Sequence, residues 1–597
     1  MTQDTRQISH GLQIPAKTYA DQPYVVRTDD AAWLCVLTTG VGREGQSGQH
    51  VITTRSTDQG KTWSTPVAVE PSDGPEASYA VLLKAPSGRI FCFYNHNTDN
   101  LREVRADDPP YPGGVCPRVD SLGYFVFKYS DDHGQSWSAR RFVIPVREMA
   151  IDRENAYGGQ VRFFWNVGRP FIHSGAAFIP LHKVGGFGHG FFTRSEGVLV
   201  KSENLLTESD PEKCSWETLP NGEAGLRTPP GGGPIAEEHS FSVLSDGSFF
   251  SVYRTIDGHP ACAYSRDGGH TWTTPDYLRY ADGSLVKHPR AANFCWRCSN
   301  GKYLYWYHNH GGNWYDDRNP VWLLGGTEVD SPTGRVIQWS QPEVVLYDDD
   351  PYVRMSYPDL IEESGRYFLT ETQKNVARVH EVPLNLLDLL WQQPERSVVT
   401  TDGLIVDLSA ASGLIAAEVP MPNLPAWSER DASRPDYGTK DLRVGFTVDL
   451  WLRLHSKAPG QIVLDNRMHN SQGFCVQTGE RGTLEIILND GRTENRWTSD
   501  LGLLNADGQH HVAIIIDGGP KIICFVVDGR LCDGGEARQF GWGRFSPHLR
   551  GVNGAKTLRV GPGLNADLTG VRIYDRALRI SEAIGNYRAG VAKTAGV

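Results

Sequence analysis

Two residue patterns have the types and spacing of metal ligands. Cys295-Trp-Arg-Cys298 has the spacing of half a zinc site, and His308-Asn-His310 places two imidazoles on the same side of a strand. No second Cys or His pair with matching spacing follows Cys298 closely. We therefore interpret the cysteines as strand residues and predict no metal site. The histidine pair is compatible with a metal ligand set and equally with an ordinary solvated strand.

Three later segments combine carboxylates, arginines and a tyrosine. They are Ala236-Glu-Glu-His-Ser with Tyr253-Arg254, Asp317-Arg318-Asn-Pro, and Ser356-Tyr357-Pro-Asp with Glu371. A phenol has a pKa of about 10, so it becomes a nucleophile at neutral pH only beside a carboxylate that takes its proton. The planar fork of an arginine binds a ligand carboxylate through two hydrogen bonds. Together these residue types suit chemistry on an acidic ligand.

A turn motif occurs three times at long, irregular intervals. The copies are Ser56-Thr-Asp-Gln-Gly-Lys-Thr-Trp63, Ser130-Asp-Asp-His-Gly-Gln-Ser-Trp137 and Ser265-Arg-Asp-Gly-Gly-His-Thr-Trp272. Asp and Gly favour a tight turn, and the Trp ring can pack that turn onto a sheet. Each copy follows an apolar, β-rich run, which predicts a hairpin. A repeated unit of several strands indicates a β-propeller.

These turns resemble the Asp boxes of the sialidase (neuraminidase) superfamily, and the order of the three segments is similar to that of its site residues. The resemblance implies that Tyr357 is the nucleophile, Glu238 its base, and Arg254 and Arg318 the residues that bind a substrate carboxylate. It further implies an exo-acting glycoside hydrolase that releases a terminal, sialic-acid-like sugar from a glycan without a cofactor. A tyrosine suits such a substrate because a carboxylate nucleophile would repel the sugar's own carboxylate.

The chain departs from the family at two places. Where sialidases have Arg-Ile-Pro, this chain reads Asp21-Gln22-Pro23, so the first arginine of a three-arginine clamp is missing. The region expected to carry the acid/base Asp contains Glu44 but no matching Asp. We therefore expect Asp21 to replace the acid/base, and another acidic or a neutral sugar stays possible. Further candidates for substrate binding are Glu371, His239, Arg290 and His96.

Two other functions stay open. Histidines are frequent near the expected strand ends, and some propeller polysaccharide lyases use His, Tyr and Arg to remove a proton beside a uronic carboxylate. The other alternative is a catalytically silent propeller that binds glycans. The products distinguish the three: hydrolysis gives only a new reducing end, a lyase gives an unsaturated product that absorbs ultraviolet light, and a binder gives neither.

The strand pattern predicts six blades of about four strands each. They lie near residues 25–66, 78–140, 168–218, 236–275, 290–341 and 352–396. The third blade ends in a degenerate turn at Ser209–Trp216, and residues 8–20 are expected to add the closing strand. We therefore predict a six-bladed, sialidase-like β-propeller over residues 1–396.

The remaining residues, 397–597, form a different domain. After a linker that contains Pro and Asp, alternating runs such as Gly445-Phe-Thr-Val-Asp-Leu-Trp-Leu predict a β-sandwich of jelly-roll type. The sequence Asp507-Gly-Gln-His-His-Val-Ala-Ile-Ile-Ile-Asp, with the segment Leu568–Ile584, resembles the laminin-G or concanavalin-like family. The chain is thus expected to be all-β with two domains. Domains of this family bind glycans in some proteins and only brace an enzyme in others.

The amino-acid composition limits the classes of partner that this chain is expected to bind. The 597 residues carry a net charge of −11, which offers no basic surface suited to nucleic acid. No run of about 18 apolar residues predicts a membrane span. The N-terminus lacks the apolar core of a signal peptide, and most of the ten cysteines lie in apolar runs. We expect a cytoplasmic protein, or a secreted or periplasmic one if a leader has been removed.

Overall fold

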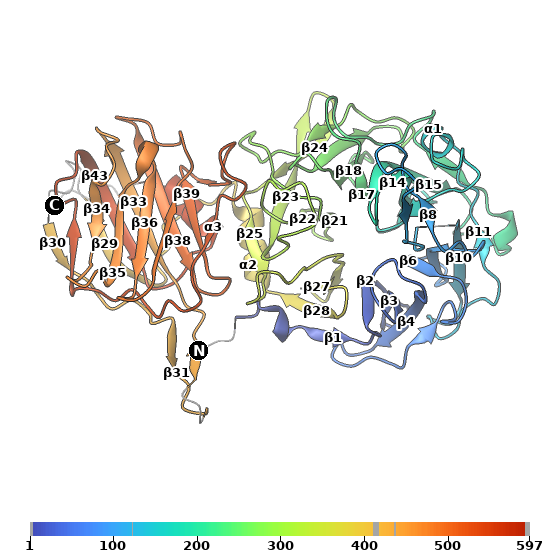
Figure 1. Ribbon diagram of the computed structural model, residues 1–597, viewed down its shortest axis with the longest axis horizontal. Helices are drawn as coiled ribbons and strands as arrows, with labels where there is room; N and C mark the ends of the chain where they lie inside the picture. Colours follow the sequence, from blue (N-terminus) through green and yellow to red (C-terminus); the bar gives the residue numbers. More distant parts are fainter. Residues whose placement is uncertain (1–3, 122, 410–416, 435–437, 591–597) are drawn as a thin grey trace. The chain divides into compact units, whose positions relative to one another are not determined.

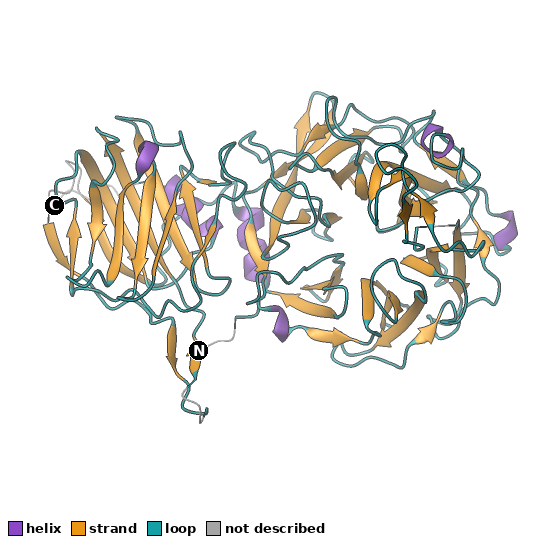
Figure 2. Ribbon diagram, in the orientation of Figure 1, coloured by secondary structure: helices purple, strands orange, loops and turns teal. Residues whose placement is uncertain are grey.

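The computed structural model describes residues 4–121, 123–409, 417–434 and 438–590. Strands are the main regular elements of these residues (Figure 2), with three short α-helices among them: α1 (Ala150–Arg153), α2 (Leu384–Gln392) and α3 (Ile580–Ala589). The predicted all-β class is confirmed. The chain divides into two compact units, an N-terminal unit of residues 8–339 and 350–384, and a C-terminal unit of residues 1–7, 340–349 and 385–597. The predicted boundary after residue 396 stays a prediction.

The described part of the N-terminal unit contains six antiparallel sheets, each with four strands along its main path. Figure 1 shows these sheets following one another around a common centre. In hydrogen-bonded order they are β2 (Tyr19–Arg27), β3 (Trp33–Gly40), β4 (His50–Ser56), β5 (Val67–Ala68); β6 (Ala77–Lys84), β7 (Ile90–His96), β10 (Tyr124–Ser130), β11 (Phe142–Val143); β12 (Phe164–Trp165), β14 (Ala176–Phe187), β15 (Phe192–Ser202), β16 (Glu217–Leu219); β17 (Glu237–Val243), β18 (Phe249–Arg254), β19 (Ala261–Ser265), β20 (Asp276–Tyr277); β21 (Phe294–Arg297), β22 (Tyr303–Tyr307), β23 (Val321–Ser331), β24 (Gly334–Trp339); and β26 (Leu360–Glu363), β27 (Arg366–Thr372), β28 (Ala377–Val382), β1 (Leu12–Ile14).

The sheet that contains β26, β27 and β28 combines strands from the beginning and the end of the N-terminal unit. β1 pairs antiparallel with β28, so the N-terminal segment completes a sheet whose other strands lie more than 340 residues later. This pairing agrees with the strand expected from residues 8–20. Apolar side chains then pack between that sheet and the sheet of β2, where the Trp33 and Phe368 rings meet edge to face at 5.0 Å between centroids. Burial of such rings holds neighbouring sheets together.

The three turn motifs share one hydrogen-bond pattern, at Ser56–Trp63, Ser130–Trp137 and Ser265–Trp272. In the second copy the Asp132 carboxylate accepts from the Ser130 hydroxyl at 2.7 Å and from the Ser136 amide at 2.9 Å. The Gly134 amide donates to the Ser130 hydroxyl at 2.8 Å, and Gly134 has φ 82°, which a glycine adopts without strain. Each turn links the third and fourth strands of its sheet.

The C-terminal unit is built around two large antiparallel sheets. One has the order β29 (Leu404–Ser409), β43 (Ala566–Tyr574), β33 (Phe446–Leu454), β38 (Gln509–Asp517), β39 (Ile522–Val527) and β40 (Arg530–Leu531), and β41 (Gly543–Arg544) also pairs with β39. The other has the order β30 (Ala417–Pro420), β42 (Thr557–Val560), β34 (Ile462–Asp465), β35 (Gly473–Thr478), β36 (Leu484–Asn489) and β37 (Glu494–Thr498). Their alternate apolar side chains share one buried core, as in a β-sandwich.

The remaining strands are short. β13 (Phe171–His173) pairs with β14, β8 (Val104–Arg105) pairs with β9 (Val115–Cys116), and β31 (Ser428–Arg430) pairs with β32 (Thr439–Asp441); β25 spans Glu343–Leu346. Across the described ranges, the helices are too short and too polar to cross a membrane.

Candidate active site

The four residues expected to catalyse and bind come from three sheets or the loops that lead into them. Glu238 lies at the start of β17, Arg254 ends β18, Arg318 precedes β23 and Tyr357 precedes β26. Arg254 Nη1 lies 2.8 Å from Glu238 Oε1, and the charge of the Glu238 carboxyl group acts on the Tyr357 phenol. Arg318 acts electrostatically on both Tyr357 and Glu238. The folded chain therefore brings together residues that are up to 119 positions apart, from 238 to 357.

Backbone bulges aim these side chains. Neighbouring residues of a regular strand point to opposite faces of the sheet, yet Glu237 and Glu238 both contact Arg254. The pairing of β17 with β18 skips between Glu237 and Ser240, and Glu238 has φ 55°. Tyr357 has φ 46°, again in the left-handed region that non-glycine residues rarely adopt. Bulges and strained residues of this kind concentrate at functional sites because they re-aim a side chain.

Glu237 is a site residue that the sequence did not single out. Its Oε2 accepts from Arg254 Nε at 2.9 Å, and its Oε1 accepts from Arg290 Nη2 at 2.6 Å. All three side chains are buried. Glu237 therefore holds two guanidinium groups in place, and Arg290, expected as a substrate-binding residue, lies in this ion-pair network. The adjacent carboxylates of Glu237 and Glu238 were the available signal, but nothing in the sequence predicted the bulge.

The two neighbouring glutamates have opposite electrostatic properties. Burial alone would raise the pKa of Glu237, but the positive charges of Arg290 and Arg254 lower it to about 2. Burial raises the pKa of Glu238 above its ordinary value, although Arg254 and Arg318 oppose this change. Two carboxylates whose pKa values move apart are suited to different roles. Glu237 is a permanent anion, and Glu238 is a carboxylate that can take up a proton.

Tyr357 is a neutral phenol in this environment. Burial raises its pKa well above the ordinary value, and the negative charge of Glu238 raises it further, while Arg254 lowers it. The Tyr357 ring also has a cation over its face, since Lys374 Nζ lies 4.1 Å from the ring centroid. A neutral phenol must lose its proton before it can attack a carbon centre. The nearest suitable acceptor is the Glu238 carboxylate.

Arg318 differs from the other two arginines of the cluster. It is buried, its Nη1 donates to the Ser356 hydroxyl at 2.5 Å, and its Nε donates to the Tyr315 carbonyl at 2.9 Å. Among the described residues, no carboxylate lies within ion-pair distance of Arg318. Burial and the charge of Arg254 accordingly lower its pKa. A buried guanidinium without a counter-ion would bind an anionic ligand favourably.

Asp21 lies in a second ionic cluster next to Tyr357. Its Oδ2 accepts from the Tyr19 hydroxyl at 2.7 Å and from Lys374 Nζ at 2.9 Å. Lys374 Nζ also lies 3.2 Å from Glu44 Oε1, and Asp21 and Glu44 both act electrostatically on Tyr357. The pKa of Asp21 lies above its ordinary value. Burial and the negative charge of Glu44 raise it, and the positive charge of Lys374 opposes them. Lys374 thus joins the candidate acid to the candidate nucleophile, and no sequence pattern indicated it.

Three other expected residues contact different parts of the N-terminal unit. Glu371 accepts from Gln373 and His380, His239 stacks on Tyr253 with 4.1 Å between ring centroids, and the His96 ring hydrogen-bonds to Thr98 at 2.7 Å. Burial lowers the pKa of His96 to about 4. The structure does not join these three to Tyr357 through any hydrogen bond or ion pair of the described residues. Their substrate-binding roles stay predictions.

The metal-ligand patterns also have other partners. Cys295 Sγ lies 3.4 Å from the Ser242 hydroxyl, and His310 hydrogen-bonds to the Asp317 carbonyl at 3.0 Å. Within the ranges that the structure describes, no group of three or more His, Cys, Asp or Glu side chains is arranged to hold a metal ion.

Aromatic side chains cover the cluster. The Tyr315 ring lies 4.9 Å from the Arg290 guanidinium carbon and 5.7 Å from that of Arg254, and the Trp165 ring lies 5.1 Å from Arg254. Tyr357, Glu238 and Arg254 are at most 2 % exposed. A substrate can therefore reach Tyr357 only if side chains above it move.

Comparison with known proteins identifies part of the chain. Residues 432–583 match a model of the concanavalin A-like lectin/glucanases superfamily, in agreement with the resemblance predicted for the C-terminal region. No curated protein matches the chain in sequence.

Similar solved structures include a Trypanosoma rangeli sialidase mutant with trans-sialidase activity, at 13 % identity and a TM-score of 0.44, covering 96 % of this chain and 93 % of that one. They also include an intramolecular trans-sialidase from Ruminococcus gnavus in complex with oseltamivir carboxylate, at 14 % identity and a TM-score of 0.43, covering 63 % and 96 %. A Dyadobacter fermentans protein of unknown function matches at 14 % identity and a TM-score of 0.44, covering 62 % and 97 %.

Proposed function

We propose that the N-terminal unit is a six-bladed propeller and an exo-acting glycoside hydrolase of sialidase type, which releases a terminal acidic sugar. The observation that carries this proposal is the buried Tyr357–Glu238 pair, in which a neutral phenol feels the charge of a carboxyl group that Arg254 holds at 2.8 Å. A phenol and a base with raised pKa, at a point where several strands converge, are suited to nucleophilic catalysis.

The reaction has two steps. The Tyr357 oxygen attacks the anomeric carbon as Glu238 takes its proton, and the leaving-group oxygen takes a proton from Asp21 as the glycosidic bond breaks. Water then attacks the glycosyl–tyrosine bond, Asp21 takes a proton from that water, and the phenolate recovers its proton from Glu238. The raised pKa of Asp21 favours the protonated form that the first step needs. The scheme requires no cofactor.

The substrate class follows from the charges. Arg254 and Arg290 are already neutralised by protein carboxylates, whereas Arg318 has no carboxylate counter-ion within the described part of the chain. We assign the carboxylate of an acidic sugar to Arg318, with Arg254 as its nearest cationic neighbour. These two arginines should bind the substrate carboxylate more weakly than three arginines without protein counter-ions would.

A polysaccharide lyase is the weaker alternative. His182 is a histidine in direct contact with this site, since the Glu238 amide donates to its Nδ1 at 3.4 Å. Burial lowers the pKa of His182 to about 3, so it is neutral at pH 7. Such a weak base is poorly matched to removing a proton from a sugar carbon at that pH.

The decisive experiment replaces Tyr357 with Phe. This change removes only the hydroxyl group, so turnover of an acidic aryl glycoside should fall at least about 100-fold while the protein stays folded. Tyr253→Phe is the matched control, because Tyr253 is equally buried but donates to the Arg227 carbonyl at 2.6 Å. Wild-type turnover in the Tyr357 variant would exclude the proposed nucleophile. An ultraviolet-absorbing unsaturated product would support the lyase.

A further inference from the structure

A cavity lies at the opposite ends of the strands that carry the candidate active site. It has a volume of about 460 Å³ and is lined by residues of five sheets of the N-terminal unit. β17 begins with Glu237 and Glu238 and ends with Val243, which lines the cavity. At about 3.3 Å per residue, the five-residue step from Glu238 to Val243 separates the two places by roughly 16 Å. The volume is in the usual range for a small-molecule site.

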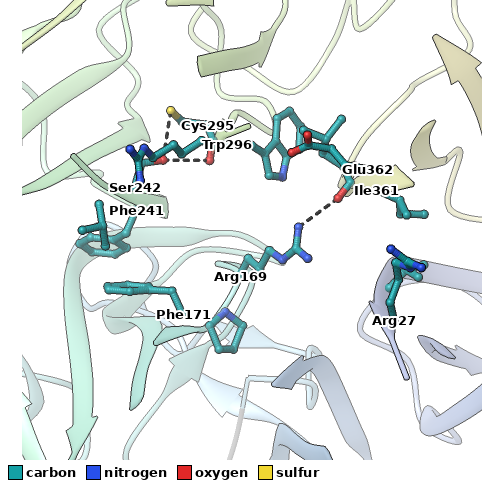
Figure 3. A pocket seen from close by; sticks show the side chains of 14 residues that line it. Arg27, Arg169, Phe171, Phe241, Ser242, Cys295, Trp296, Ile361 and Glu362 are labelled. Atoms are coloured by element: carbon teal, nitrogen blue, oxygen red, sulfur yellow. Dashed lines mark hydrogen bonds between the residues drawn. The ribbon is translucent and has the colours of Figure 1, made fainter. Parts of the chain in front are cut away.

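Three arginines converge on this cavity: Arg27 at the end of β2, Arg297 at the end of β21, and Arg169 in the loop before β13. Their side chains are 46 %, 44 % and 42 % exposed, so each guanidinium is accessible to a ligand. Figure 3 shows Arg169 in the middle of the cavity, with Phe171 and Arg27 on either side of it in that view.

Each arginine is supported by one protein carboxylate. Arg27 Nη2 lies 3.0 Å from Glu363 and Arg169 Nη1 lies 3.1 Å from Asp359, whereas Arg297 Nε lies 4.0 Å from Glu328. A guanidinium has five N–H donors, so these contacts leave most of the donors available to an anion.

The acidic residue in the lining is already engaged. Both carboxylate oxygens of Glu362 accept from the Ser299 amide at 3.0 Å, and Oε2 also accepts from the Ser299 hydroxyl at 2.6 Å. Glu362 is therefore bound to a neighbouring loop. Within the lining itself three guanidinium groups stand against this one carboxylate, while Glu363, Asp359 and Glu328 pair with the arginines from outside the lining.

Aromatic rings complete the lining. Trp296, Phe171 and Phe241 contribute apolar surface beside the guanidinium groups. A ligand that matches both features has an anionic group for the arginines and a ring with C–H faces for the aromatic side chains. A sugar acid has this combination, and a bare phosphate or a neutral sugar lacks one half of it.

We propose that this cavity is a second binding site, for a carboxylate-bearing sugar such as a uronic or sialic acid. The choice of a sugar acid rests on the proposed function, while the anionic character of the ligand follows from the cavity itself. The same strands reach both places, so a sugar acid could be bound at each end of them.

The test is calorimetric titration of the full chain with sodium D-glucuronate and N-acetylneuraminate, with methyl β-D-glucopyranoside as the neutral probe. Hydrogen–deuterium exchange locates the binding. We expect the acids to slow exchange in peptides covering residues 241–243, 295–297 and 360–362, and the neutral sugar to have no effect there. The double variant Arg27→Gln/Arg297→Gln should bind the acids at this site at least 10-fold more weakly.

Two further variants keep the result interpretable. Arg335→Gln is the matched control, since its side chain is 38 % exposed and pairs with Asp330 away from the cavity. Arg27→Lys/Arg297→Lys retains the charges and should bind with intermediate strength, which separates recognition from a folding defect.

The outcomes separate this proposal from the proposed function. Unchanged exchange in the three peptides, or equal binding by wild type and Arg27→Gln/Arg297→Gln, would overturn the second site. Protection of those peptides in a protein that turns over no acidic glycoside would instead support the second site and contradict the proposed hydrolase.

Discussion

Adjacent glutamates at the start of β17 acquire different roles from their surroundings. Glu237 accepts hydrogen bonds from Arg254 and Arg290, which keep it ionised, whereas Glu238 is buried beside a phenol. Residue type alone does not distinguish them, because both are glutamates of one strand. What separates them is the number of guanidinium groups that each carboxylate contacts. The catalytic assignment at Glu238 therefore depends on a local electrostatic difference.

The pH dependence of the reaction tests that assignment. Glu238 must be ionised to take the phenolic proton, so kcat/KM should fall as the pH drops through its raised pKa. Glu238→Gln should lower turnover at least about 100-fold and remove this acidic limb from the activity that remains. Glu70→Gln is the control, since Glu70 is also buried but pairs with Arg141. An unchanged acidic limb in the Glu238 variant would assign the titration to another group.

The unpaired guanidinium of Arg318 predicts the substrate preference. Arg318→Lys keeps the positive charge but loses the planar fork, so it should cost about 1.5–3 kcal/mol in transition-state binding, the scale of one charged hydrogen bond. The measurement is kcat/KM on an acidic sugar glycoside and on its methyl ester. The loss should appear on the acid and be small on the ester. Equal losses on both substrates, or a wild-type preference for the ester, would contradict an acidic substrate.

At the scale of elements, the Asp-box turns and the bulges have different functions. The turns close the outer hairpins through local hydrogen bonds, whereas the bulges turn selected residues of the inner strands. Similar positive φ values occur at Gln22 in β2 (54°), Tyr79 in β6 (58°) and Glu238 in β17 (55°). The ladder of each of these strands also has a register shift at that point. One repeated backbone device thus presents side chains from several sheets.

The turn at Ser130–Trp137 provides a stability test away from the candidate site. Burial raises the pKa of Asp132, but hydrogen bonds from Ser136 and Ser130 lower it below the ordinary value overall. The ionised Asp132 carboxylate should therefore contribute fully to the free energy of unfolding above its unfolded pKa of about 4. This contribution should be lost as the pH falls through the lower pKa of the folded state. Asp132→Ala should lower the free energy of unfolding by about 1 kcal/mol at pH 7 and by less in acid. Chemical denaturation at both pH values measures this. A constant difference would contradict the charged hydrogen bonds.

The sequence could predict these elements where their causes are local. The three turns at Ser56–Trp63, Ser130–Trp137 and Ser265–Trp272 depend on residues within one turn, and each forms at the position that the motif predicted. The degenerate copy shows the limit. The sequence suggested Ser209–Trp216, but the polar side chain that organises the turn is Asn204, whose Oδ1 accepts from the Ser215 amide at 2.8 Å. An insertion separates the two halves of this turn, so no contiguous motif remains.

At the scale of the whole molecule, the site residues that resembled a known order were predictable and their partners were not. Glu238, Arg254 and Tyr357 meet in the structure. Glu237 joins them because of a bulge in β17, and Lys374 joins them from a position where its own backbone has φ 72°. Such contacts depend on how sheets far apart in sequence pack together. For the same reason the sequence could not predict the cavity of Arg27, Arg169 and Arg297, because two of them end strands of different sheets and Arg169 lies in a loop.

The division into two units predicts how the thiols become accessible on unfolding. All ten cysteines are free, and burial raises the pKa even of the partly accessible Cys214 to about 11 and of Cys262 to about 12. Because the thiolate is the reactive form, the native protein should react slowly with a thiol reagent at pH 8. Cys475, Cys524 and Cys532 belong to the C-terminal unit, and the others to the N-terminal unit.

If each compact unit unfolds cooperatively, all cysteines of one unit should become labelled at a common denaturant midpoint. Pulse labelling along a urea series, followed by mass spectrometry of the peptides, measures each midpoint. Complete unfolding without a reductant should label all ten residues. Separate midpoints for Cys475 and Cys524 would show that the sandwich strands do not form one cooperative unit. Separate midpoints for Cys35 and Cys295 would show that the sheets around Tyr357 do not form one cooperative unit either. The geometry of the candidate site requires these sheets to be folded at the same time.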